Sequence, residues 1–466
     1  MFNSLAAALA SLLFLLAATQ AQAAEPQTVE AVFAQRETNR LVMKVEAALA
    51  QAQAELGIIS RAAADEIART ATPEYAPEDA LAAEYDVVRH RMVALLNVWR
   101  RSLSPEASDA LHLGATTVDI YDTVMILQLR RAIELQRARL LEAETAMLAL
   151  AAEHRDTPMI GRTLGQHALP ITFGKKVAVW AGGNRRSIER LDAVYCRLGR
   201  LGVMRGAVGT HLGLGPQGAQ IEQRTAAALG LGPVSAADWH GMRDVFGEYA
   251  AAQAIMARVN AGIGQEVFML QLTDIGEVSE RRSGSAVSSS SMPHKSNPNR
   301  SESLMHLGRV IPAQASIILD DIANLFERDN TSRPNTVLEE LSKQGFESAE
   351  DLTGLIRRLE VDRQRMARNL ELTDGMIMAQ RIVLTVQDDL GKEHAEDLVA
   401  AAARASQANG TSFRQELLAD EELAPLLRGQ IDELLDYRSY LGDAVGQVSR
   451  TIAELEGSRA AISCAD

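Results

Sequence analysis

The sequence predicts an all-α protein of three helical domains, whose central domain is a bundle of long helices, and three observations support this. Apolar residues recur at helical spacing over long stretches, namely residues 28–56, 122–152, 250–278 and 303–326. The alternating pattern typical of strands is almost absent. Alanine, leucine, glutamate and arginine dominate, and all of them are good helix formers.

Glycine and proline gather in a few short segments, and these breaks divide the chain. We expect an N-terminal helical domain over residues 24–111, a central long-helix bundle over 112–365 and a C-terminal helical domain over 366–466. Helices of about thirty residues with apolar side chains on more than one face usually need partners, so we also expect the protein to form oligomers.

Residues 1–23 are predicted to be a signal peptide. A short apolar run over residues 5–18 ends in Ala21-Gln22-Ala23, a small-x-small pattern that signal peptidases accept. No Lys or Arg precedes this run, so a cytosolic N-terminal helix or an uncleaved anchor is the alternative. We expect a periplasmic or secreted protein with no membrane span after cleavage.

Composition narrows the class of protein. The 47 Lys and Arg residues against 61 Asp and Glu residues give a net charge of -14, which argues against a nucleic-acid partner. Cys196 and Cys464 lie far apart in the sequence. We interpret them as two incidental thiols rather than a disulfide framework or a zinc site.

The segment 283–302 has the most unusual chemistry in the chain. Six serines and a glycine lead into Met292-Pro293-His294-Lys295-Ser296-Asn297-Pro298, and such a run disfavours a helix. Pro298 suits the first turn of the following helix. The loop therefore brings a hydroxyl, an ammonium and an amide to a helix N-terminus, where a substrate carboxylate or a carbanion delocalised onto it would be favoured.

Two further polar segments accompany this loop. Residues 112–123 place the hydroxyls of Thr116 and Thr117, which can hold a carboxylate, before Asp119 and Asp122, which can cap the next helix. Residues 161–174 combine glycines with threonine, glutamine and histidine.

The loop Ser289–Pro298 resembles the signature loop of the fumarase/aspartase superfamily. His294 and the following Arg300-Ser301-Glu302 resemble its branch of adenylosuccinate lyases and 3-carboxy-cis,cis-muconate cycloisomerases. The resemblance covers the whole mature chain. It implies an all-α homotetramer whose sites combine segments of three chains, with a di- or tricarboxylate as substrate and no metal or other cofactor.

The resemblance also implies roles for particular residues. Ser289 would be the base, Lys295 and Asn297 would stabilise the resulting negative charge, and His167 or His90 would protonate the leaving group. The expected substrate-binding residues are His112, Thr116, Thr117, Thr163, Gln166, His240, Arg243, Ser290, Met292 and Arg328.

One position departs from the adenylosuccinate lyase pattern. Leu164 stands where those enzymes carry a histidine acid, and His167 is the arrangement associated with the cycloisomerase-like members. We favour a lyase that cleaves a C–N or C–O bond of a succinyl-type dicarboxylate and releases fumarate. A lactonising cycloisomerase is the first alternative, and a non-catalytic helical scaffold is the second.

Overall fold

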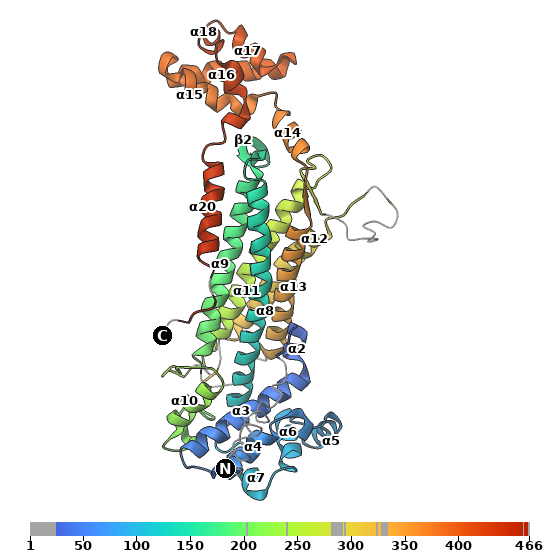
Figure 1. The fold of residues 1–466 in the computed structure, drawn as a ribbon, viewed down its shortest axis with the longest axis vertical. Helices are drawn as coiled ribbons and strands as arrows, with labels where there is room; N and C mark the ends of the chain where they lie inside the picture. The colour runs from blue at the N-terminus through green and yellow to red at the C-terminus, as the bar shows by residue number, and fades with distance from the viewer. Residues whose placement is uncertain are drawn as a thin grey trace, which may run out of the picture.

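The computed structural model describes residues 25–201, 204–238, 241–280, 292, 295–322, 325–327, 334–459 and 461–464. Nearly all regular structure in these residues is α-helical, as the sequence predicts. The strands form two small two-stranded antiparallel sheets, β1 with β2 and β3 with β4. Figure 1 shows an elongated molecule with its long helices parallel to the long axis.

The N-terminal domain occupies one end of this rod (Figure 1). Its helices pack around buried residues that include Leu49, Ile67 and Trp99. They are α2 (Val29–Phe33), α3 (Gln35–Glu55), α4 (Arg61–Thr70), α5 (Glu78–Val88), α6 (Arg91–Arg100) and α7 (Pro105–Ala110), with a 3₁₀ turn η1 (Pro73–Tyr75).

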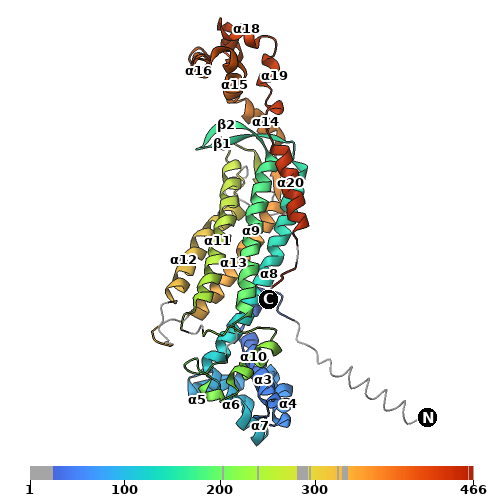
Figure 2. The same cartoon turned by 90° about the vertical axis from the view of Figure 1, so that its left-hand side faces the viewer.

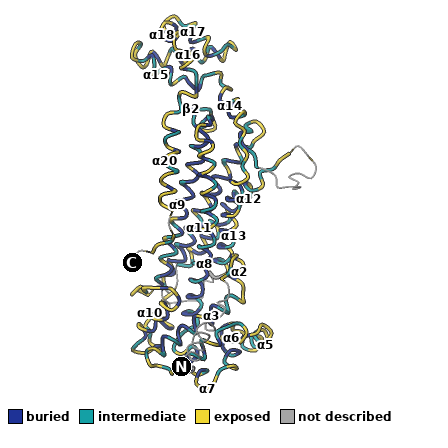
Figure 3. Tube along the Cα trace, in the orientation of Figure 1, coloured by how far each residue is buried: buried dark blue, intermediate teal, exposed yellow. Residues whose placement is uncertain are grey.

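Within the described part of the chain, five long helices form the central bundle, α8 (Thr117–Glu153), α9 (Phe173–Gly199), α11 (Asp244–Leu270), α12 (Asn299–Asp320) and α13 (Pro334–Arg357). Buried positions run along the inside of the whole bundle, as Figure 3 shows. The shorter elements between them are β1 (Pro158–Thr163), β2 (Gln166–Thr172), η2 (Leu212–Leu214), α10 (Gly218–Ala228), β3 (Val278–Glu280) and β4 (Leu359–Val361).

The far end of the rod carries a small helical unit with a core of its own (Figure 2). It contains η3 (Met376–Met378), α15 (Ala379–Leu390), α16 (Lys392–Asn409), α17 (Phe413–Ala419), α18 (Leu423–Leu427), α19 (Ile431–Leu435) and η4 (Tyr437–Ser439), and α14 (Arg363–Glu371) leads into it. The last helix, α20 (Ala444–Gly457), returns to the bundle, where Val448 and Leu455 join the main core. The unit at the tip is therefore smaller than the expected 366–466 domain.

The returning helix explains an error of the sequence analysis. Cys196, near the end of α9, forms a disulfide with Cys464, 268 residues away in the sequence, with the two Cα atoms 5.2 Å apart. The interpretation of two incidental thiols is therefore wrong. It failed because α20 runs back along α9 and carries the C-terminal tail to Cys196 (Figure 1).

A buried ionic cluster holds the same tail. The guanidinium of Arg185 donates to Glu144 at 2.7 and 2.8 Å and to the carbonyl oxygen of Leu455 at 2.7 Å. Arg459 donates to Glu144 at 2.9 Å.

Among the described residues, no helix has the length and apolarity needed to cross a membrane.

Candidate active site

The loop before α8 is held by a capping carboxylate and by a close backbone contact. Asp119 accepts hydrogen bonds from the backbone N–H groups of Thr116 at 3.0 Å and of Arg205 at 3.1 Å. Gly114 has a φ of +75°, and a Cβ there would lie 2.4 Å from the carbonyl oxygen of Gly213. Only glycine permits this approach, which fixes the half-buried Thr116 and Thr117 at the start of α8.

His112 lies in the same loop and faces the N-terminal domain. Its Nδ1 is 2.6 Å from a carboxylate oxygen of the buried Glu46. Burial lowers the pKa of His112, but the hydrogen bond and the charge of Glu46 outweigh burial and raise the pKa above its usual value. A protonated His112 would add positive charge beside the two threonines.

Arg243 differs from the expectation that it meets a substrate carboxylate. Its guanidinium is buried and donates to both carboxylate oxygens of Asp122, at 3.1 and 3.2 Å. This two-pronged pair joins the start of α11 to the first turns of α8, so within one chain Arg243 positions helices. Of the two aspartates expected to cap α8, Asp119 accepts the capping hydrogen bond, whereas Asp122 pairs with Arg243.

His90 is an exposed residue directly before α6. Its Nδ1 accepts a hydrogen bond from the backbone N–H of Val93 at 3.3 Å, so the ring caps the helix. His90, His112, Thr116 and Thr117 all belong to the end of the rod that holds the N-terminal domain (Figure 1).

The second group of predicted residues lies on the β1–β2 hairpin at the other end of the bundle. Thr163 and Gln166 form the last paired position of the hairpin, and both are exposed. The two residues between them, Leu164 and Gly165, turn the chain with φ values of +50° and +77°. Leu164 therefore projects from the hairpin tip.

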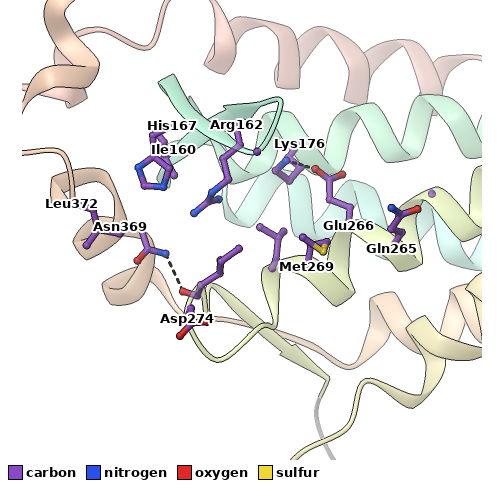
Figure 4. Close-up of a pocket in the computed structure, with 14 residues that line it drawn as sticks. Ile160, Arg162, His167, Lys176, Gln265, Glu266, Met269, Asp274, Asn369 and Leu372 are labelled. Atoms are coloured by element: carbon purple, nitrogen blue, oxygen red, sulfur yellow. Dashed lines mark hydrogen bonds and ion pairs between the residues drawn. The ribbon is translucent and has the colours of Figure 1, made fainter.

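His167 lines a pocket of about 550 Å³ between the hairpin, the first turn of α9 and the last turns of α11 (Figure 4). Burial, and secondly the positive charge of Arg162, lower the pKa of His167 below its usual value, although Glu277 opposes them. The neutral imidazole is therefore favoured near neutral pH.

The polar lining of this pocket was not found from the sequence. Arg162 donates to both carboxylate oxygens of Glu277 at 2.7 and 2.9 Å, and Asn369 donates to Glu277 at 2.7 Å. Glu266 accepts from Lys176 and Trp180. These partners come from separate helices and loops, so no spacing rule in the sequence relates them.

The serine-rich loop is described only at Met292 and residues 295–298 in its second half. Lys295 is exposed and Asn297 is half-buried, immediately before α12. Ser289, Ser290, His240 and Arg328 lie outside the described residues, so their predicted roles stay predictions.

The N-terminus of α12 was expected to bind a substrate carboxylate, but a carboxylate of the chain itself occupies it. The carboxylate of Glu280 accepts hydrogen bonds from the backbone N–H groups of Arg300 at 3.1 Å and of Ser301 at 3.0 Å. It also accepts one from the Ser301 hydroxyl at 2.7 Å. Glu280 thus already supplies the negative charge that this helix end favours. Pro298 is the residue before the first helical position, Asn299.

The loop with Thr116 and Thr117 and the hairpin with Gln166 and His167 cannot form one site within a single chain. Helix α8 has 37 residues and is about 55 Å long. Thr117 stands at its first position, whereas Gln166 and His167 lie beyond its last (Figure 1). A site that uses both groups needs segments of different chains.

The fold and these motifs define a class of helical lyases, and comparison with known proteins gives the same result. Residues 19–312 match the family model described as Lyase, and residues 375–451 match the one described as Adenylosuccinate lyase C-terminus. The chain belongs to this lyase family, the fumarase/aspartase superfamily, and is an enzyme of it.

Its relatives include members with different activities. The adenylosuccinate lyase of Methanocaldococcus jannaschii is 33% identical over 91% of this chain and 93% of its own length. The N-acetyl-S-(2-succino)cysteine lyase of Enterococcus italicus is 33% identical over 88% and 90%. The 3-carboxy-cis,cis-muconate lactonizing enzyme of Pseudomonas putida superimposes with a TM-score of 0.84 at 29% identity, over 92% of this chain and 97% of that one.

Proposed function

We propose that this enzyme eliminates a heteroatom leaving group from a succinyl-type dicarboxylate and releases fumarate. The observation that carries the proposal is the near-full-length similarity to two relatives named for succinyl compounds, in which the heteroatom is nitrogen or sulfur. These relatives support a C–N or C–S scissile bond, and the C–O bond expected from the sequence is the third candidate. The described part of the signature loop keeps the ammonium of Lys295 and the amide of Asn297.

The reaction requires a base, a charge-stabilising group and an acid. Ser289, as an alkoxide, takes the proton from the carbon beside one carboxylate. The electron pair becomes the C=C bond of fumarate while the bond from the neighbouring carbon to the heteroatom breaks. Lys295 and Asn297 stabilise the charge that spreads onto the carboxylate during this step. The hydroxyls of Thr116 and Thr117 hold the other carboxylate.

The leaving group must receive a proton, and His167 and His90 are the two candidates for this step. Burial together with Arg162 lowers the pKa of His167, and the Nδ1 of His90 is occupied as a hydrogen-bond acceptor in the α6 cap. A variant of one histidine decides between them. If His90 is the acid, replacing it by Asn should reduce kcat more for amine than for thiol leaving groups, because thiolates leave without protonation more easily. An equal loss for both would argue against His90 as the acid.

The assay compares succinyl compounds that differ in the heteroatom. N-alkylaspartates, O-alkylmalates and S-alkylsuccinates are offered separately, and ultraviolet absorbance follows the release of fumarate. The wild-type enzyme should turn over at least one class, and Ser289→Ala should abolish turnover while leaving the oligomer intact. Lack of turnover in all three classes would contradict the proposal.

The alternative function is lactonisation, which the similarity to the Pseudomonas putida enzyme favours. The same protein incubated with 3-carboxy-cis,cis-muconate would then form a lactone. Lactone formation without any fumarate release would select this alternative. Inactivity on every compound would contradict both functions.

We also propose a homotetramer in which each site draws on three chains. The support is the separation of the Thr116–Thr117 loop from the hairpin along α8. Ser289→Ala and Thr117→Val change different segments, so each variant alone should be inactive. When the two inactive proteins are mixed under conditions that exchange subunits, some sites would contain neither change, and activity should return. Absence of recovery in verified mixed oligomers would contradict shared sites.

A periplasmic or secreted location is the last part of the proposal. The Cys196–Cys464 disulfide supports it, because disulfides persist mainly in oxidising compartments. Expression of the full chain followed by cell fractionation and mass spectrometry should find a protein that begins at Ala24. A cytosolic protein that retains Met1 would contradict export.

A further inference from the structure

Tyr437, in η4 of the small helical unit at the tip, carries a buried hydroxyl without a partner. The residue is only 7% exposed, and its ring packs in a small core with Ile160, Leu370 and Ile377. Among the described residues, none provides a hydrogen-bond partner for this hydroxyl. Buried hydroxyls nearly always have a partner in folded proteins, so the partner of this one has to come from outside these residues.

Tyr437 lines a pocket of about 410 Å³ at the place where the bundle meets the unit at the tip. The pocket lies between the end of α8, the start of β1, α14 and η4 (Figure 2). Its size is near the lower end of the range for small-molecule sites, about 300–1,000 Å³. None of the described residues that line it also lines the pocket of His167. It is therefore a separate candidate site for a small ligand.

The charged groups of this pocket are divided by sign between two sets of elements. The acidic residues, Glu153 and Asp156, come from the end of α8 and the turn that follows it. The basic residues, Arg363 and Arg438, come from the first position of α14 and from η4. The bundle thus supplies the negative charge, and the segments beyond it supply the positive charge.

The arginines are available to a ligand. Arg363 donates to Glu153 at 3.2 Å, and the two side chains are 55% and 64% exposed. Arg438 lies 3.4 Å from Asp436, and its own side chain is 65% exposed. Ion pairs this open to water contribute little, so a ligand can replace either partner at small cost. The guanidinium of Arg438 also lies over the ring of Tyr437, 4.6 Å from its centroid, so its movement toward a ligand would uncover the tyrosine.

We propose that this pocket binds a small α-amino acid as its zwitterion. The carboxylate of the amino acid binds Arg363 and Arg438 and accepts a hydrogen bond from the hydroxyl of Tyr437. Its ammonium group faces Glu153 and Asp156. The inference does not depend on the proposed elimination, because binding is measured without turnover.

The charges of the pocket disfavour simpler ligands. An anion without an ammonium group would bring its charge to the two carboxylates, and a cation without a carboxylate would meet the two guanidinium groups. An apolar ligand would remove water from these charged groups without replacing it. A zwitterion alone satisfies both sets of charges.

The test uses three ligands of similar size that differ in their charges. L-alanine carries both charged groups, propionate lacks the ammonium group, and ethylamine lacks the carboxylate. In isothermal titration calorimetry, L-alanine should bind once per chain and about tenfold or more tighter than either of the others, because each of them loses a charge-assisted contact. Binding of propionate or ethylamine as tight as that of L-alanine would overturn the inference, as would a lack of saturable binding of L-alanine, glycine and L-serine.

Two variants locate the bound amino acid. Tyr437→Phe keeps the ring in its small core and removes only the hydroxyl, whereas Arg363→Gln removes one guanidinium. Each should weaken the binding of L-alanine by about fivefold or more. Arg414→Gln, at an exposed pair with Asp432 in the same unit, is the matched control and should bind L-alanine as the wild type does. Wild-type affinity in both pocket variants would place the amino acid elsewhere and overturn the inference.

Discussion

Two glycines in the left-handed region differ in what surrounds them. Gly57 and Gly114 have nearly the same φ, +74° and +75°, but a Cβ on Gly57 would meet nothing within 4 Å. A Cβ on Gly114 would meet the carbonyl of Gly213. The pair therefore separates the cost of an unfavourable backbone angle from the cost of a collision in the loop before α8.

We expect Gly57→Ala to lower the free energy of unfolding by about 1–2 kcal/mol, the cost of the left-handed conformation. Gly114→Ala should cost more, because the loop must also move away from residue 213. Urea denaturation of both variants measures the difference. The altered loop should raise KM for the Gly114 variant and leave KM of the Gly57 variant unchanged. Equal losses of stability would contradict the close contact.

His112 makes part of the stability depend on pH. Because its pKa is raised in the folded protein, its stabilising contribution is fully present below the unfolded pKa and is lost as pH rises through the folded pKa. Glu46→Gln should lower the pKa of His112, as an NMR titration of its ring would show. It should also destabilise the protein more at about pH 5–6 than above pH 8. A pH-independent difference would contradict a charged pair.

At the scale of elements, buried ion pairs decide how the helices of the bundle meet. Asp122 on α8 and Arg243 at the start of α11 are both buried, with only 6% and 10% of their side chains exposed to solvent that could replace the partner. Exposed pairs such as Lys392–Glu396 lie within one helix, α16, and are open to water. The sequence shows the charges but does not distinguish these two situations.

Asp122→Ala should destabilise the protein by about 3–5 kcal/mol, because it leaves the guanidinium of Arg243 buried without its carboxylate. Glu396→Ala, the control at the exposed pair, should cost less than about 1 kcal/mol. The double variant Asp122→Leu with Arg243→Met should recover much of the loss. Chemical denaturation of the four proteins tests this, and a double variant as unstable as Asp122→Ala would contradict the explanation.

At the scale of the whole molecule, the C-terminal tail is fixed to the bundle in two ways. The disulfide joins it to the end of α9, and the Arg185–Glu144–Arg459 cluster holds it along α8 and α9. The disulfide thereby closes a covalent loop that contains all residues between Cys196 and Cys464, more than half of the chain. This arrangement explains how α20, which follows the small helical unit at the tip, becomes part of the central core.

Removal of the disulfide by Cys464→Ser should destabilise the protein by about 2–5 kcal/mol. Cys196→Ser and the double variant should show the same loss, because each abolishes the same bond. Differential scanning calorimetry with and without a reductant measures the effect, and only the wild-type transition should respond to the reductant. A wild-type protein with two titratable thiols would contradict the disulfide.

The sequence by itself determined the all-α class and, through its motifs, the lyase family, whereas the site residues that it names stay predictions. Helical periodicity and motif chemistry are local properties, which a chain carries in the order of its residues. Tertiary structure alone decided that Cys196 meets Cys464, that Arg243 pairs with Asp122 and that Glu280 covers the N-terminus of α12. It also placed Thr117 and Gln166 at opposite ends of the bundle, because a helix of fixed rise per residue separates them whatever their side chains favour.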